Sequence, residues 1–291
     1  MGHPPRQSPN FPARSESEQT WGVSQLGDSS APLIIHVPHA GTLIPPEERA
    51  RLLLDDGGLA LELRRMTDWH TDRLAVDALE LAGVGGVVFV NRASRLVVDP
   101  ERLTDDAEPM AAIGMGRVYL VTSQLHPLRH ADPTDDQRLL DRWFHPYTVA
   151  FARLVDETLD EHGQVTIVDL HSFPSEPLPY EPDPLAHRPG VCIGTDPDHT
   201  PLAVATAALR AFAGIKDGVA ENTPFAGTYV PLDHWRRTRE VVSIMIEVRR
   251  DLYLQEPGPL QEGYDTVVAG LARFLLALTP GSPAEGTAQT I

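Results

Sequence analysis

Short apolar runs alternate with longer amphipathic stretches over most of this chain. Runs of β-branched and aliphatic residues, bounded by glycine, proline or polar residues, predict strands at residues 32–37, 86–91, 165–170, 191–194 and 241–248. Helical spacing of apolar residues predicts helices at residues 46–54, 68–82, 135–162, 201–212 and 263–278. Strands that alternate with helices are typical of an α/β fold, here a mixed, mostly parallel sheet flanked by helices.

The two ends of the chain lack this pattern. Residues 1–30 are rich in Pro, Ser, Gln and Glu without hydrophobic periodicity, and residues 280–291 read the same way, so we expect loose tails. Between them, no internal repeat and no shift in composition marks a second domain. Residues 31–279 are therefore expected to form one α/β domain. Within it, the many prolines of residues 170–198 predict an irregular loop over the edge of the sheet.

Composition and charge narrow the classes of partner. With 41 acidic against 24 basic residues, the net charge of −17 argues against nucleic acid or an anionic membrane surface. A small molecule or another protein is favoured, and the oligomeric state is left open. The single cysteine, Cys192, excludes an internal disulfide and a cysteine-rich metal site. Because no membrane span or apolar signal segment is recognisable, we expect a soluble, cytoplasmic protein.

Polar side chains stand at the carboxyl ends of three predicted strands, where open α/β sheets gather their functional groups. His39 follows the first strand, His171 and Ser172 follow the middle strand, and Glu247 ends the last one. Asp169 shares a strand face with His171 and could orient a ligating imidazole. A partly desolvated carboxylate such as Glu247 suits general acid/base chemistry.

Each of these residues also has an ordinary structural interpretation. His39 could simply satisfy a hydrogen bond, and the pair His171 and Ser172 could cap a turn. Glu247 could form an ion pair with the adjacent Arg249 or Arg250. The sequence alone leaves both interpretations open for each residue.

A further carboxylate, Asp68, lies at the start of a predicted helix. It could cap the helix N-terminus or provide an oxygen ligand to a metal, with His70 as its competitor for the second role. Two histidines and one carboxylate, with an open fourth position, form the ligand set of hydrolytic zinc sites. The pattern therefore indicates a site for one Zn²⁺ per chain, with His39 and His171 as ligands and either Asp68 or His70 as the third, although another divalent metal would suit the same donors.

Four segments resemble the motifs of the N-formylglutamate amidohydrolase family. They are Val37-Pro-His-Ala-Gly41, Thr67-Asp-Trp-His70, Ser94-Arg-Leu-Val-Val-Asp-Pro-Glu-Arg102 and Asp169-Leu-His-Ser172, and the similarity runs in order from about residue 32 to 254. The resemblance implies a fold similar to zinc carboxypeptidases and aspartoacylases. It also implies that His39 and His171 match the two histidine ligands and Glu247 the catalytic glutamate. Asp68 is the best match for the acidic ligand.

The third motif resembles the segment whose arginines face the substrate's carboxylates in this family. Arg95 and Arg102, and with them Arg92, are therefore expected to bind substrate, with Asp99 as a lesser candidate. The alternative is a surface pair of arginines neutralised by neighbouring acidic residues. The family more often has Asp-Leu-Asn-Arg here, so that Glu101 stands in place of a neutral asparagine and puts a dicarboxylate substrate in question.

The resemblance implies a zinc-dependent amidohydrolase that cleaves the formyl group from N-formylglutamate or a related N-formyl or N-acyl amino acid. Two alternatives remain: a related metallo-hydrolase acting on a different N-acyl amino acid or a small peptide, and a metal-free binding protein that has lost activity. A serine hydrolase built on Ser172 is disfavoured because no Gly-x-Ser-x-Gly elbow surrounds this residue.

Overall fold

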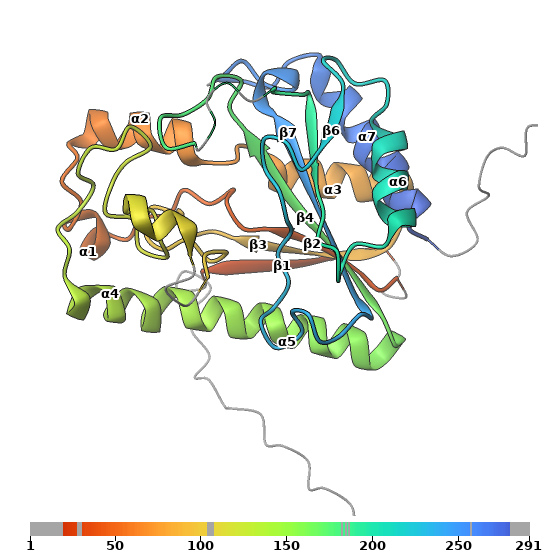
Figure 1. The fold of residues 1–291 in the computed structure, drawn as a ribbon, viewed down its shortest axis with the longest axis horizontal. Coiled ribbons are helices and arrows are strands. Elements are labelled where there is room, and N and C mark those ends of the chain that lie inside the picture. Colours follow the sequence, from red (N-terminus) through yellow and green to blue (C-terminus); the bar gives the residue numbers. More distant parts are fainter. Residues whose placement is uncertain are drawn as a thin grey trace, which may run out of the picture.

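A seven-stranded sheet forms the centre of the structure (Figure 1). The computed structural model describes residues 20–27, 31–103, 108–181, 183, 185, 187–256 and 258–279. The strands are β1 Trp21–Leu26, β2 Leu33–Val37, β3 Gly86–Asn91, β4 Val165–Phe173, β5 Val191–Gly194, β6 Val219–Glu221 and β7 Val241–Arg249. Their order is β1-β3-β2-β4-β7-β5-β6. Only the β1–β3 and β5–β7 pairs are antiparallel, so the predicted mixed, mostly parallel sheet is confirmed.

Helices cover both faces of this sheet. They are α1 Pro46–Arg49, α2 Asp56–Met66, α3 Thr71–Ala82, α4 Pro133–Leu139, α5 His145–His162, α6 Leu202–Ala211 and α7 Gly263–Ala277. Helices α3, α6 and α7 share one core cluster with the sheet, and α5 packs against the sheet in another (Figure 1). In the second cluster Tyr147, Phe151 and Val155 contact the strand residues Ile34 and Ile167. This part of the predicted apolar stripe does face the sheet, as expected.

The predicted long helix over residues 135–162 is confirmed with one interruption. A single π-helical turn, Leu140–Phe144, joins α4 to α5. It ends two residues before Pro146, which has no backbone N–H to donate. The helix therefore changes its hydrogen-bonding register there and continues along the sheet.

Two expectations need correction, and one helix was missed. Residues 21–26, which we expected within a loose tail, form the edge strand β1; its outer side is solvent-exposed, so its sequence lacks the apolar run of a buried strand. The remaining tail expectations, for residues 1–19, 28–30 and 280–291, lie outside the described residues. Helix α2 was not predicted, because its first turn carries two glycines. The predicted helix 46–54 ends early, at Arg49.

The strands that carry the candidate chemistry are longer than predicted. Strand β4 continues to Phe173 and β7 to Arg249, because the two pair in parallel along nine positions. His171, expected just beyond its strand, consequently lies inside the sheet, directly opposite Glu247. Among the described residues, no helix has both the length and the hydrophobicity needed to cross a bilayer.

Candidate metal and catalytic site

His39 is buried in the turn that follows β2. This turn passes so close to the β3 exit that a Cβ at Gly41 would lie 2.4 Å from the carbonyl group of Arg92, so only glycine fits. The Nε2 of His39 lies 2.9 Å from Oδ1 of Asp99. Because a carboxylate only accepts hydrogen bonds, Nε2 carries the hydrogen and donates it. The other ring nitrogen, Nδ1, faces the site.

His171 makes an ion-pair contact, rather than a hydrogen bond, with a second buried carboxylate, that of Asp169. The Nε2 of His171 lies 3.1 Å from Oδ1 of Asp169, two residues earlier on β4. Asp169 is fixed in turn by His36, whose Nδ1 is 2.9 Å from Oδ1, and by the backbone N–H of Tyr229, 3.0 Å from Oδ2. The predicted orienting contact between Asp169 and His171 is therefore present. Both ring nitrogens of His36 have hydrogen-bond partners, since its Nε2 contacts the Tyr147 hydroxyl at 2.7 Å.

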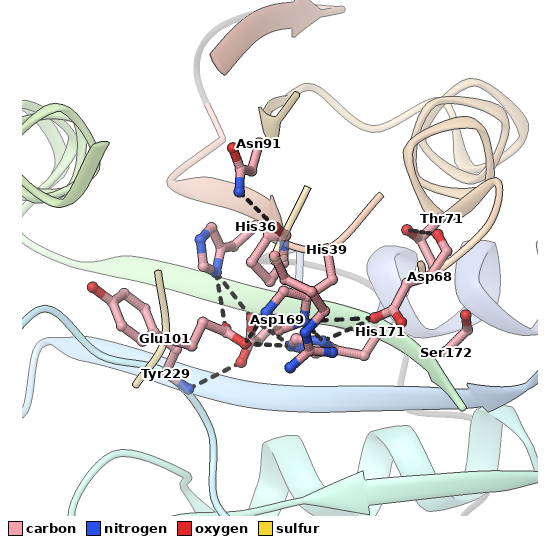
Figure 2. Close-up of polar contacts among 12 residues, drawn as sticks. His36, His39, Asp68, Thr71, Asn91, Glu101, Asp169, His171, Ser172 and Tyr229 are labelled. Atoms are coloured by element: carbon pink, nitrogen blue, oxygen red, sulfur yellow. Dashed lines mark hydrogen bonds and ion pairs between the residues drawn. The ribbon is translucent and has the colours of Figure 1, made fainter. Parts of the chain in front are cut away.

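Asp68 lies between α2 and α3 with its carboxylate pointed at the two histidines (Figure 2). It does not cap helix α3, which begins at Thr71; the hydroxyl of Thr71 donates to the Asp68 backbone carbonyl instead. Oδ1 of Asp68 accepts a hydrogen bond from Arg250 at 3.0 Å. The second oxygen, Oδ2, is thereby left to face the imidazoles.

The three donor atoms that face the centre are mutually close. The two Nδ1 atoms of His39 and His171 are 3.2 Å apart, and Oδ2 of Asp68 lies 3.7 and 3.2 Å from them, respectively. Ligand atoms about 2.0–2.1 Å from a tetrahedral zinc ion are separated by about 3.3–3.4 Å. These residues also form one of the groups whose donors converge closely enough to hold a metal ion. The donor set and its geometry fit a metal of this kind.

The electrostatics of the centre favour a cation. Burial alone would raise the pKa of Asp68, but hydrogen bonds with His171 and His39 and the charge of Arg250 outweigh it and hold the pKa well below its usual range. For His171, burial would lower the pKa, yet the surrounding carboxylates, Asp169 among them, raise it well above its usual value. The carboxylates around the two imidazoles thus favour positive charge at this centre.

Glu247 stands beside this centre on β7, in register with His171 on the neighbouring strand. Its Oε2 atom is buried and, within the described part of the chain, has no hydrogen-bond partner. Burial raises the pKa of Glu247 to about 8. The alternative of an ion pair with the adjacent arginines is wrong: Arg249 binds Asp217 and Asp251, whereas Arg250 binds Asp68 and Ser172. The carboxylate is thus unpaired within a site, the environment expected of an acid/base group.

One cavity of about 770 Å³ is lined by His39, Asp68, His171, Glu247 and Arg250. Arg95 and Arg102 also line it, and both lie near Asp99. Arg95 is tied to Asp99 by a 2.6 Å hydrogen bond, whereas Arg102 makes only longer contacts, at 3.4 Å to Asp99 and 3.5 Å to Glu108. The Nε of Arg102 is buried and has no hydrogen-bond partner among the residues that the structure describes. Arg102 is therefore the more available of the two for an incoming carboxylate.

The structure does not bring every candidate to the cavity. Arg92 is exposed and its guanidinium lies against Gly22 of β1, so we withdraw it as a substrate-binding candidate. His70 does not line the cavity either; it adopts a left-handed backbone conformation (φ 64°) at the residue before α3. Ser172 lines the cavity, but its Oγ accepts a hydrogen bond from Arg250.

Glu101 lies closer to the centre than its place in the arginine motif suggests (Figure 2). Its Oε2 is 3.5 Å from Nε2 of His39 and 3.4 Å from Nε2 of His171, and its Oε1 is 3.6 Å from Nδ1 of His36. The residue that differs from the common family motif therefore touches all three histidines.

Two residues that sequence reasoning missed complete the centre. Arg250 was considered only as an ion-pair partner of Glu247, and Asp99 only as a lesser substrate-binding candidate. In the structure Arg250 holds Asp68 and Asp99 holds His39. No local pattern signals either contact, because the partners are separated by 182 and 60 residues.

The fold and the site define an α/β protein with a buried centre of two histidines and a carboxylate beside an unpaired glutamate. Residues 31–254 match the model of the N-formylglutamate amidohydrolase family, and the chain belongs to that family. It is accordingly a hydrolase that acts on amide bonds. No curated protein matches the chain.

Two solved structures share the fold. An N-formylglutamate amidohydrolase from Ralstonia eutropha JMP134 has a TM-score of 0.73 and 24% identity, covering 88% of this chain and 96% of its own. A gene product from Agrobacterium tumefaciens has a TM-score of 0.63 and 20% identity, with 90% and 95% covered. These likenesses support the fold.

Proposed function

We propose that the chain is a zinc-dependent amidohydrolase that removes the formyl or another acyl group from an N-acylated amino acid. The observation that carries this proposal is the convergence of the Nδ1 atoms of His39 and His171 with Oδ2 of Asp68, at 3.2–3.7 Å. Both imidazoles present Nδ1 because their Nε2 atoms lie beside carboxylates: that of His39 is hydrogen-bonded to Asp99, and that of His171 lies 3.1 Å from Asp169. Family membership supplies the reaction class.

His39, Asp68 and His171 would hold the metal, leaving a fourth position open to the cavity. When bound, zinc would polarise the amide carbonyl and lower the pKa of a water towards about 7. Glu247, unpaired and beside His171, would take the proton of the attacking water and then deliver it to the departing nitrogen. Arg102 would hold the carboxylate of the substrate. The products would be an amino acid and a short carboxylic acid, formate for an N-formyl substrate.

A screen of N-formyl and N-acyl amino acids for release of free amine, with zinc supplied, tests this function directly. Release of amine that requires the metal supports it. The two alternative functions predict different results. A hydrolase of small peptides would cleave dipeptides but no N-formyl compound. A metal-free binding protein would contain no metal and cleave nothing.

Replacing Arg102 with Ala should mainly raise KM, because a carboxylate bound equally in the ground and transition states contributes to affinity rather than to kcat. Loss of a partly desolvated, charged hydrogen bond should cost on the order of 2–4 kcal/mol. Steady-state kinetics on the screened substrate measures the effect. Arg92→Ala is the matched control, since Arg92 is exposed and lies outside the cavity. Equal kinetics for both variants would remove Arg102 from the substrate site.

Replacing Asp169 with Asn should weaken metal binding by about 10–100-fold, because the amide keeps the shape but loses the charge that orients His171. Competition with a chromophoric chelator measures the affinity. The control is Asp77→Asn on α3, whose carboxylate accepts a hydrogen bond from Tyr264 and does not line the cavity. If both variants bound metal as tightly as the wild type, the carboxylate would have only a structural role.

A further inference from the structure

One wall of the cavity is apolar and is built from two distant segments. The N-terminal half of α5 forms one side, and residues 224–235, between β6 and β7, form the other. In Figure 1 the segment between β6 and β7 descends in front of the sheet towards α5. It is fastened there by His234, whose Nε2 lies 2.8 Å from Oδ1 of Asp156 on α5, and by the rings of Tyr229 and Phe151, 5.7 Å apart. The side chains of this apolar wall include Phe144, Val149, Phe225, Tyr229, Leu232 and Trp235.

This apolar wall presents hydrophobic surface to the solvent that fills the cavity. Val149 on α5 is 48% exposed and Leu232 on the opposite segment is 44% exposed, and both line the cavity. Exposed apolar side chains that line a cavity next to reactive groups are typical of a surface that a ligand covers. The ligand part that fits this wall is an aliphatic or aromatic group.

Glu101 places a negative charge at the edge of the same wall. Burial and then the charge of Glu101 raise the pKa of Tyr229, and Figure 2 shows the two side chains next to each other. Glu101 also contacts His36, whose ring stacks on that of Tyr229 with centroids 5.1 Å apart. An anionic group entering along the apolar wall would therefore meet a carboxylate of the same sign.

An α-amino acid carries its carboxylate and its side chain on the same carbon, so the two must be bound near each other. Arg102, the available carboxylate binder, follows Glu101 in the chain and lines the same cavity. A substrate carboxylate on Arg102 directs the adjacent side chain towards Glu101 and the apolar wall. A second carboxylate in that side chain would lose hydration there and be repelled.

We propose that the preferred substrate is an N-formyl or short N-acyl α-amino acid with an apolar side chain, aliphatic or aromatic, rather than N-formylglutamate. This inference rests on the proposed function and specifies its substrate class. The side chain lies against Val149, Leu232 and Trp235, the α-carboxylate is held by Arg102, and Glu101 excludes a side-chain carboxylate.

The first test compares kcat/KM of the zinc-loaded protein for N-formyl-L-phenylalanine, N-formyl-L-leucine and N-formyl-L-glutamate at one pH and ionic strength. We expect the apolar substrates to be favoured by at least about tenfold, equivalent to roughly 1.4 kcal/mol. A preference for glutamate would overturn the inference while leaving the proposed function intact, and would point to Arg65, which also lines the cavity, as the second carboxylate binder. Hydrolysis of none of the three by metal-loaded protein would instead contradict the proposed function, and the inference with it.

The second test introduces a positive charge into the apolar wall, which should favour an anionic substrate side chain. Leu232→Arg places a cation where the side chain of the substrate is expected, so the ratio of kcat/KM for phenylalanine to that for glutamate should fall about tenfold. Leu276→Arg on α7 is the matched control: Leu276 is 46% exposed, close to the 44% of Leu232, and lies outside the cavity. An unchanged ratio in Leu232→Arg, at wild-type zinc content and melting temperature, would show that the substrate side chain does not contact this wall.

Discussion

Replacing Glu247 with Gln is expected to lower kcat by roughly 10²–10⁴-fold while leaving the fold and the bound metal in place. The substitution keeps the volume and outline of the side chain but removes the atom that takes the proton. Glu247 faces the centre beside His171, and no ion pair holds it. Its loss should therefore affect proton transfer rather than structure. Single-turnover and steady-state kinetics on one preparation, with its zinc content, measure the effect.

The melting temperature separates this role from a structural one. Burial raises the pKa of Glu247 to about 8, above the value of an unfolded glutamate. Between these two values the folded chain binds more protons than the unfolded chain, so this group makes the metal-free protein less stable as pH rises. The metal-free Gln variant should thus melt no lower than wild type at pH 7. Full activity with a lowered melting temperature would contradict the catalytic assignment.

A matched control for this experiment is Glu157→Gln. Glu157 lies on the exposed side of α5, where it pairs with Arg153, and it does not line the cavity. An exposed pair of this kind contributes little to stability. The kcat of Glu157→Gln should equal that of wild type. A large loss of kcat in Glu247→Gln would then be due to the position of Glu247 in the site and not to the exchange of Glu for Gln as such.

Sequence patterns predicted those site residues that lie at the end of a single strand. His39 and His171 follow apolar runs, and in a largely parallel sheet such positions meet at one edge. The convergence of these two residues with Asp68 is present in the structure, while their role as ligands stays a prediction. The expected orienting contact from Asp169 could be read from its two-residue spacing on the strand.

Contacts across distant segments could not be predicted in this way. Arg250 reaches Asp68 only because the end of β7 passes the turn before α3, and Asp99 reaches His39 through the path of a loop. Arg92 was misplaced for the same reason: its motif neighbours enter the cavity, but its own position, directly after β3, faces β1. Loop paths depend on tertiary packing, which the periodicity of a sequence does not encode.

Removing both histidines, His39→Ala with His171→Ala, is expected to abolish metal binding and with it amide hydrolysis. Wild-type protein should carry about one zinc ion per chain by elemental analysis, and the double variant close to none. Two of three ligands are lost, and the carboxylate of Asp68 that remains is neutralised by Arg250. Because Asp99 and Asp169 would each lose a buried partner, circular dichroism should accompany the metal measurement. His171→Gln, which can still contact Asp169, serves if the double variant fails to fold.

A comparison of variants at Asp68 and at His70, the two residues that the sequence offered as the third metal ligand, decides between them. Asp68→Asn should lower zinc affinity strongly, because a neutral amide replaces the only anionic ligand of the centre. His70→Asn is the matched control, since asparagine tolerates the left-handed backbone at this position and His70 lies outside the cavity. We expect His70→Asn to retain about one zinc ion per chain. Loss of zinc from the His70 variant but not from the Asp68 variant would reverse the assignment, and stoichiometric zinc in the double histidine variant would place the metal site elsewhere in the chain.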